Sequence, residues 1–445
     1  MGSKFAHLII ASMIQGLLSD NILTRFDMYA GRVRVLYGAS AEIRPTPFAC
    51  TYLSCLRHPL IPGLRKIRIS DLYYDWSVLL LLCSTKLKSV DVFKGGDEDG
   101  HKLGAFLHSL RASAGHETHG LEKLRIFPAH HTHVDFITKF DMLQDIVLLF
   151  DSGTTGPLLV EDFSKLSALR RLSRLSLTWH VDDAHQSFVS SLLPPPHSVN
   201  FLSLHSIEIR VPSYMVLLLV QCLRADNLKR IELKSLSSPL CQPTAPRRII
   251  EECDFVATSL EADFAFHGNL RIGRETFDSI LNLTRRFQLR RLAFDGRELE
   301  IDDAYINSAY VARCFSHLEI LCLTSHRYLP HCAVTLQVLR SLAIHCPLLK
   351  DLDLSFTVEE EHLPLLVKEM EKPSLSHPLQ SLIIRLKDKP ETTQFFANGE
   401  SILIVSRYLK SLFPSLDLRD IRWTHWIQYD TFIKGIRRTL KELQI

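Results

Sequence analysis

The chain has 445 residues, of which 46% are hydrophobic, and its 52 basic and 49 acidic side chains leave a formal net charge of +3. So apolar a composition excludes a disordered chain, because burial of apolar surface can offset the entropy lost on ordering. Gly 18 and Pro 20 exclude collagen-like and low-complexity classes, and the charge balance gives no indication of a dedicated nucleic-acid-binding protein. The length suits roughly two to four globular domains unless the chain is one repeat array.

Cysteine usage and apolar patterning predict the compartment. The ten cysteines are irregularly spaced, form no CxxC motif and lie in part within apolar runs such as Leu81-Leu82-Cys83. We therefore expect reduced thiols in a cytoplasmic or nuclear protein. The longest fully apolar runs, Val78–Cys83 and Met215–Val220, fall far short of the ~20 residues that a membrane span needs, so no membrane association is expected.

One short phrase, Leu-x-x-(Leu/Ile/Val)-x-(Leu/Ile/Val), recurs along the chain. Its clear copies are Leu64-Ile67-Ile69, Leu87-Val90-Val92, Leu121-Leu124-Ile126, Leu172-Leu175-Leu177, Leu204-Ile207-Ile209, Leu228-Ile231-Leu233, Leu289-Leu292-Phe294, Leu318-Leu321-Leu323, Leu349-Leu352-Leu354 and Leu379-Leu382-Ile384. Weaker copies are Ala30-Val33-Val35, Leu143-Ile146-Leu148 and Phe413-Leu416-Leu418, and a distorted one covers Phe264 and Phe266. The mean period is about 32 residues, slightly above the usual leucine-rich range.

The phrase predicts one strand per repeat. Its last two apolar residues alternate with polar ones, which is the pattern of a strand with one buried face. The intervals leave room for a return helix, and Phe277, Ile280 and Leu281 show helical spacing before the strand at Leu292. Because each repeat exposes an apolar face that only its neighbours can cover, we predict an α/β leucine-rich-repeat solenoid with a curved parallel sheet and outer helices.

The predicted organisation has three parts. Residues 1–24 are interpreted as an N-terminal helical cap or remnant, 25–420 as the solenoid and 421–445 as a C-terminal capping helix carrying Trp423 and Trp426. An interaction helix is the alternative for the last segment. For the whole chain the alternative is a doubly wound α/β enzyme, since the phrase also arises by chance inside helices, as at Leu339-Leu342-Ile344.

Several segments resemble fungal leucine-rich-repeat proteins of the F-box type. Residues Arg25–Leu36 resemble that family's "RF..YA.RVR.L" segment, and Leu60–Ile67 resembles its "LLPNLR.L" segment. Cys346–Leu352 resembles "CP.L..L", and Tyr408–Leu416 resembles "YL..LFP.L". The resemblance covers about residues 25–420. It implies the substrate-binding part of an SCF-type ubiquitin-ligase receptor.

The F-box itself is not found. In the family it precedes the repeats with an LP-x-E-like start, and Leu17-Leu18-Ser19-Asp20 is not that motif. A ubiquitin-ligase adaptor is therefore an expected partner only if an F-box is missing from this chain. Otherwise we expect a repeat scaffold that binds an unknown protein and is unrelated to ubiquitin.

The sequence offers few groups for catalysis or metal binding. It contains no GxGxxG after a strand, no GxxxxGK[ST] and no GxSxG, so no enzyme activity and no cofactor are expected. The histidines of His116-Glu117-Thr118-His119, the cluster His130, His131 and His133, and the pairs His331-Cys332 and His345-Cys346 include types that bind metals. For the cluster we favour a polar loop after the strand at Ile126, and we predict no metal site.

Paired carboxylates occur at Asp182-Asp183 and Asp302-Asp303, and Glu359-Glu360-Glu361 forms a short acidic run. Adjacent carboxylates can shift one pKa and serve acid–base chemistry. The interpretation that we favour is that they begin helices, where the N-terminal amides stabilise negative charge.

The candidate binding surface consists of strand residues that alternate with the buried ones. On the concave face we expect Arg32, Arg34, Lys66, Arg68, Lys123, Arg125, Arg174, Arg230, Ile320, Asp351 and Asp353. The first half of this face is mostly basic, whereas the last third is apolar at Ile320, Cys322 and Ile383 and acidic at its aspartates, Asp417 included. We predict a partner with an acidic end and an apolar and basic end.

Overall fold

The computed structural model describes residues 20–38, 59–69, 83–93, 100–113, 119–151, 160–180, 199–212, 216, 219–220, 222–236, 263–268, 271–272, 274–287, 289–296, 298–299, 301–307, 314–325, 334–356, 360–386, 399–416, 421–423, 435–436, 438–439 and 441–442, and the structural statements below concern these residues. The chain divides into two compact units. Unit 1 comprises Met1–Val211 and Cys222–Asn227, and unit 2 comprises Pro212–Gln221 and Leu228–Ile445.

Unit 1 is an α/β structure built on parallel strands that follow one another in chain order. The strands are β1 (Val35–Gly38), β2 (Lys66–Ile69), β3 (Ser89–Phe93), β4 (Lys123–Ala129), β5 (Asp145–Asp151), β6 (Arg174–His180) and β8 (Ser206–Pro212). The helices are α2 (Asp20–Ala30), α5 (Gly100–Ala112), α6 (His131–Ile137) and α7 (Val160–Ser167), and β7 (Val199–Asn200) pairs with β9 (Leu223–Arg224). Parallel neighbours require the chain to return between strands, and α5, α6 and α7 make that return from β3 to β6.

Unit 2 has the same design. Its parallel strands are β10 (Arg230–Leu236), β11 (Asp263–Gly268), β13 (Arg291–Gly296), β15 (Ile320–Ser325), β16 (Asp351–Phe356), β17 (Ser381–Leu386) and β18 (Ile421–Trp423). Its helices are α10 (Arg274–Phe287), α11 (Asp303–Ile306), α13 (Val338–His345), η3 (Glu360–His362), α14 (Leu363–Met370) and α16 (Gly399–Leu412), and β12 (Arg271–Ile272) pairs with β14 (Glu298–Leu299).

The strand register aligns equivalent positions of the recurring phrase. In unit 1 Ile67 lies opposite Val90, which lies opposite Leu124, and all three side chains are fully buried. The distorted copy is also a strand, because Phe264 lies opposite Ile231 in the ladder of unit 2. These pairings confirm that the phrase marks strands, and each buried Leu or Ile contributes about 1.5–3 kcal/mol of transfer free energy.

The first leucine of the phrase closes a turn before its strand. The backbone N–H of Leu143 donates to the carbonyl of Phe140 (3.1 Å), and that of Leu349 donates to Cys346 (3.0 Å). Both leucines are buried, so the turn brings the side chain beneath the strand that follows. This geometry repeats at Leu64, Leu87, Leu172 and Leu318.

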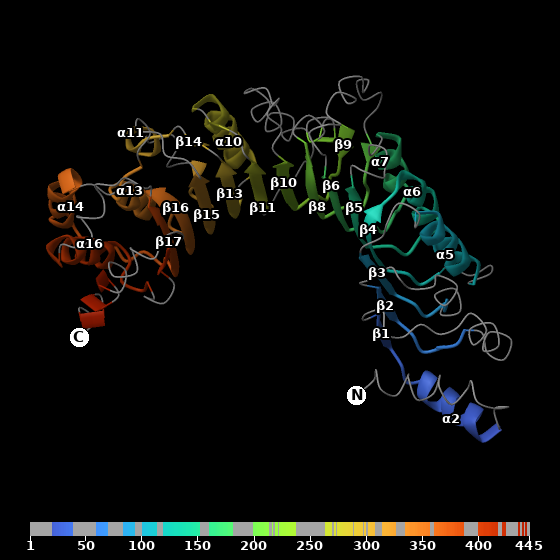
Figure 1. Ribbon diagram of the computed structural model, residues 1–445. Coiled ribbons are helices and arrows are strands. Elements are labelled where there is room, and N and C mark those ends of the chain that lie inside the picture. The colour runs from blue at the N-terminus through green and yellow to red at the C-terminus, as the bar shows by residue number, and fades with distance from the viewer. Residues whose placement is uncertain are drawn as a thin grey trace. The chain divides into compact units, whose positions relative to one another are not determined.

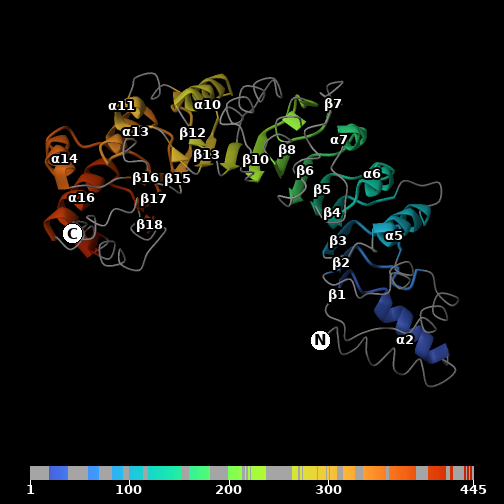
Figure 2. The same cartoon turned by 45° about the horizontal axis from the view of Figure 1, so that its top comes forward.

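The helices of each unit lie on one face of its strands. In unit 1, α5, α6 and α7 stand in a row on the same side of the sheet, and neighbouring helices pack against one another (Figure 1). In unit 2, α14 packs on α16, and α13 also contacts α16 (Figure 2). No described helix covers the other face, which we call the open face of each unit. None of the described helices combines the length and the apolarity that crossing a membrane requires.

The prediction for the first repeat copy was wrong in register. Ala30 ends helix α2, and Val33 closes the turn with its N–H on the Ala30 carbonyl, as the leading leucine does in other copies. Strand β1 then places Leu36 opposite Ile67, so the copy is Val33-Leu36-Gly38. Consequently Arg32 and Arg34 precede the strand instead of lying in it, because helical hydrogen bonding persists through Ala30.

The prediction for the last copy was also wrong in register. Helix α16 ends at Leu412, and Phe413 is still tied to it by an N–H bond to the Leu409 carbonyl (2.8 Å). Strand β18 begins only at Ile421, which lies opposite Leu382. Trp423 is therefore a strand residue, not part of a C-terminal helix, whereas the residues described between 435 and 442 are helical.

Candidate binding surface

Side chains on the open face of unit 1 form ladders across its strands. The first ladder places Lys66, Ser89, Lys123, Asp145, Arg174 and Ser206 side by side. The second places Arg68, Asp91, Arg125, Val147, Ser176 and Glu208 side by side. The structure thus brings together five predicted basic residues, while the equivalent positions in β1 are Val35 and Tyr37 instead of Arg32 and Arg34.

Part of this positive charge is neutralised within the face. Lys66 Nζ lies 3.1 Å from an Asp91 carboxylate oxygen, and the Asp91 side chain is only 4% exposed. A carboxylate that is so nearly buried needs a nearby cation, because desolvation penalises an isolated charge. Lys66 therefore stabilises the sheet and has less capacity to bind a partner than the sequence suggests.

Asp145 lies between two arginines without neutralising either of them fully. Its carboxylate oxygens are 3.8 Å from Arg125 Nη2 and 4.0 Å from Arg174 Nε, which are long separations for ion pairs. The side chains of the two arginines are 42% and 50% exposed, so both guanidinium groups are accessible to solvent and to a ligand. Lys123 is exposed in the same ladder as Asp145.

Apolar side chains follow these two ladders on the same face. Phe93 lies opposite Phe127, and Leu149 continues the alternation of β5 beyond Val147, although the register between β4 and β5 shifts after Ile126. All three side chains are partly exposed, and the Arg68 guanidinium lies 5.1 Å from the centre of the Phe93 ring. The sequence interpretation did not include these residues because the phrase ends before them; the signal was the continued alternation of polar and apolar residues after it.

The last strand of this face, β8, carries an acidic side chain whose charge is balanced by an arginine of the same strand. Glu208 accepts a hydrogen bond from Arg210 Nε (2.5 Å) and another from the Ser176 hydroxyl (3.3 Å). The excess of cationic charge is therefore concentrated on β2 to β6.

On the open face of unit 2, the charged side chains of the first strand, β10, form ion pairs with one another. Glu232 contacts both Arg230 (2.8 Å) and Lys234 (2.5 Å). Partial burial alone raises the pKa of a carboxyl, but the two cations outweigh it and hold the pKa of Glu232 below its usual range. Arg230, although predicted for the binding face, is thus already paired.

Strands β15, β16 and β17 of unit 2 carry the apolar and acidic residues that the sequence analysis named for the concave face. Ile320, Asp351 and Ser381 are neighbours in one ladder, and Cys322, Asp353 and Ile383 are neighbours in the next. The Cys322 thiol donates to Asp353 Oδ2 (3.5 Å). Asp417, also expected here, lies outside the described residues.

Arg34 has a structural position at the start of unit 1. Its Nη1 donates to the carbonyl oxygens of Gly31 and Gly63, the latter at 3.2 Å. The arginine thereby joins the turn before β1 to the turn before β2. Arg32 is exposed and lies in the same turn.

The cluster His130, His131 and His133 is a helix start and not the polar loop that we predicted. Helix α6 begins at His131, and the backbone N–H of Thr132 donates to the His130 ring (3.2 Å). The His133 ring in turn accepts from the backbone N–H of His130 (2.9 Å), which completes a capping box. The described residues contain no group of three side chains positioned to hold a metal ion.

The other candidate groups are accounted for as follows. Asp302 caps α11 by accepting from the Tyr305 N–H (2.8 Å), which confirms the helix-start interpretation of that aspartate pair. Asp182-Asp183, His116 and His331-Cys332 lie outside the described residues. The described cysteines are free thiols, and burial raises the pKa of Cys346 to about 12, so it is held as the neutral thiol.

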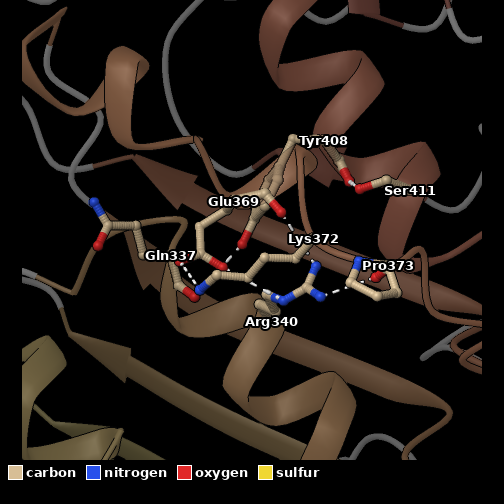
Figure 3. A network of polar contacts seen from close by, with 7 residues as sticks. All are labelled: Gln337, Arg340, Glu369, Lys372, Pro373, Tyr408 and Ser411. Atoms are coloured by element: carbon tan, nitrogen blue, oxygen red, sulfur yellow. Dashed lines mark hydrogen bonds and ion pairs between the residues drawn. The ribbon is translucent and has the colours of Figure 1, made fainter. Parts of the chain in front are cut away.

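A polar network that the sequence did not predict joins the helices of unit 2 (Figure 3). Arg340 on α13 is only 8% exposed and donates to the carbonyls of Glu369 (3.3 Å) and Pro373 (2.9 Å). Its Nε lies 3.4 Å from the Glu369 carboxylate. The buried Tyr408 hydroxyl on α16 donates to the Gln337 carbonyl (3.5 Å). These contacts fix α13, α14 and α16 behind the sheet.

The comparisons with known proteins do not assign a family. No family model matches this chain, and no significant match was found among the curated proteins.

Proposed function

We propose that this chain is a leucine-rich-repeat solenoid that recognises another protein through the open faces of its sheets and has no catalytic role. The observation that carries the proposal is the difference between the two faces of the sheet in each unit. Helices lie on one face, while charged and polar side chains form ladders on the other. The recurrence of the phrase once per strand, about every 32 residues, supports it, because stacked repeats share one continuous core.

The charged groups of the open faces also favour recognition. Their guanidinium, ammonium and carboxylate groups are partly exposed and stand on strands, which hold side chains in fixed relative positions. Such arrays give specificity and steer a complementary partner. An α/β hydrolase-like enzyme, the alternative, would require convergent polar groups in a deep pocket.

Crosslinking and mass spectrometry test this proposal. The tagged full chain is expressed, crosslinked to its partners, and compared with a variant carrying Arg125→Glu and Asp351→Lys, one change on each open face. We expect partner abundance to fall about tenfold or more, in line with the cost of placing like charges together. A matched variant with Lys368→Glu and Arg407→Glu, at exposed residues of helices α14 and α16, should retain the partner. Equal recovery with both variants would contradict the proposal.

A more specific role follows from the sequence resemblance alone. We propose that the partner is a substrate delivered to an SCF-type ubiquitin ligase, with the adaptor bound only where an F-box accompanies these repeats. Cys346 and Leu349 of the resembling segment form the turn that leads into β16, as a repeat consensus would require. Probing the purified full chain for the ligase adaptor tests this role. A chain with its native upstream sequence that captures no adaptor would rule it out and leave the recognition proposal standing.

A further inference from the structure

The open face of unit 1 has a composition that selects one kind of partner. Its cationic side chains do not all have the same role, because Lys66 is committed to the nearly buried Asp91. The cations that remain are Arg68, Lys123, Arg125 and Arg174. We call these four residues the basic band.

An apolar ridge runs beside the basic band. Phe93 and Phe127 are paired one pleat beyond it, Leu149 follows in the alternation of β5 where the β4–β5 register shifts, and all three are partly exposed. Residues on neighbouring strands stand about 4.8 Å apart, and successive residues on one face of a strand about 6.6 Å apart. A partner that crosses these strands therefore meets cations and apolar groups within one side-chain length of each other.

We propose that the basic band and the apolar ridge of unit 1 together bind a segment of a partner protein in which aspartate or glutamate alternates with bulky apolar residues. The inference rests on the proposed function and specifies the partner chemistry of one of its faces. Carboxylates of the segment would pair with Lys123, Arg125 and Arg174, whose side chains are exposed to solvent over much of their surface. Its apolar side chains would cover the ridge and exclude water from those pairs, which strengthens them.

Acidic side chains within the face argue against nucleic acid as the ligand. Asp91 and Asp145 interrupt the cations on alternate strands, and Glu208 closes the row. A continuous phosphate backbone would pass close to these carboxylates, whereas a peptide can place its acids only where the face offers a cation. The apolar ridge likewise has no counterpart on a phosphate backbone.

Fluorescence anisotropy with the purified full chain tests the proposal. The probe is a fluorescein-labelled peptide of three Glu-Leu-Glu-Ser repeats, and the comparison peptides replace every Glu by Gln, every Glu by Lys or every Leu by Ser. We expect saturable binding of the Glu-Leu probe that weakens as salt is raised. Each replacement should reduce the affinity by about tenfold or more. Absence of binding, or equal affinity for the Gln peptide, would overturn the proposal, as would tighter binding of an oligothymidylate of the same length.

Matched variants locate the binding on unit 1. Lys123→Gln with Arg125→Gln should weaken the Glu-Leu probe about tenfold, and Leu149→Ser should weaken it about threefold. Lys368→Gln with Arg407→Gln removes the same charge from helices of unit 2 and should leave the affinity unchanged, with circular dichroism checking that each variant is folded. If the variant with Arg125→Glu and Asp351→Lys loses the partner but these unit 1 variants bind the probe normally, this inference fails while the proposed function stands.

Discussion

His377 joins two neighbouring repeats of unit 2 through its two ring nitrogens. Nε2 lies 2.7 Å from the carbonyl oxygen of Cys346, which is 31 residues earlier in the chain. Nδ1 accepts the backbone N–H of Leu379 (3.2 Å), so the proton of the neutral ring is on Nε2 and is donated to Cys346. The imidazole thus replaces the carbonyl that closes the turn before the strand in other repeats.

His119 occupies the equivalent place in unit 1. Its Nδ1 accepts the N–H of Leu121 (3.1 Å), and its ring packs edge-on against Phe140 at 5.5 Å, as His377 does against Phe413. Burial lowers the pKa of His119 to about 4, with a smaller contribution from Arg111, and the backbone of Ser84 opposes the shift without cancelling it.

The folded protein should lose stability in mild acid because of His119. Its folded-state pKa lies below the unfolded value of about 6.5, so the unfolded chain binds the proton more readily as pH falls from about 6.5 to 4. Full stability is therefore expected above this window, with a loss of about 2 kcal/mol by about pH 5. Urea unfolding at several pH values measures it.

Two variants separate His119 from the other histidines. His119→Asn keeps an acceptor near the Nδ1 position but cannot titrate, so its loss of stability between neutral pH and about pH 5 should be smaller by about 2 kcal/mol. His317→Asn, at an exposed position of unit 2, should keep the native pH dependence. Identical pH profiles for the wild type and His119→Asn would show that the buried imidazole does not set this dependence.

Removal of the Arg340 side chain should destabilise unit 2. In Arg340→Ala, the carbonyls of Glu369 and Pro373 lose their donor, and the Glu369 carboxylate loses a nearly buried partner. The expected cost is about 2–3 kcal/mol, because two carbonyls are left without a donor, while the Glu369 carboxylate keeps its ion pair with Lys372 (2.5 Å). Chemical denaturation followed by circular dichroism measures this cost.

The exposed pair Arg438–Glu442 provides a control for Arg340. It joins side chains that are 83% and 61% exposed, so Arg438→Ala should change the unfolding free energy by less than about 0.5 kcal/mol. If the two alanine variants were equally stable, the network of Figure 3 would have no energetic role.

Gly63 should not tolerate even a methyl group. A Cβ at this position would lie 2.5 Å from the Gly31 carbonyl oxygen and would meet Arg34 Nη1. Gly63→Ala must therefore displace the turn before β2, and we expect a loss of about 1–3 kcal/mol with lower protection of β1 and β2 amides. Hydrogen exchange measures this locally. Gly399→Ala, where a Cβ would meet no atom within 4 Å, is the matched control and should be neutral or stabilising.

Lys66 and Lys123 should differ in stability although both stand at the first position of a strand. Lys66→Met leaves the carboxylate of Asp91 without its ion pair, and we expect a loss of about 1–3 kcal/mol. Lys123→Met removes an exposed cation and should cost less than about 0.5 kcal/mol. Thermal unfolding measures the stability of the two variants. Equal stability would mean that the Asp91 carboxylate does not need the ion pair with Lys66.

The recurring phrase is sufficient to predict the strands and most of their register. The apolar residues Leu124 and Ile126 predict a strand, because every second side chain of a half-buried strand lies on the same face. Phe277 and Ile280 follow the spacing of a helix. The two end copies were misplaced because α2 extends to Ala30 and α16 to Leu412, and helix ends depend on local hydrogen bonds that the phrase does not encode.

Which charged residues are available to bind a partner depends on contacts between strands, which the phrase does not reveal. Lys66 and Lys123 are indistinguishable in the phrase, yet register places Lys66 within 3.1 Å of a carboxylate on the next strand. The ridge formed by Phe93, Phe127 and Leu149, and the Arg340 network, also join residues that are distant in sequence. A local pattern predicts which face of an element is apolar. It does not predict which side chains of different strands meet, because that depends on how the strands pair.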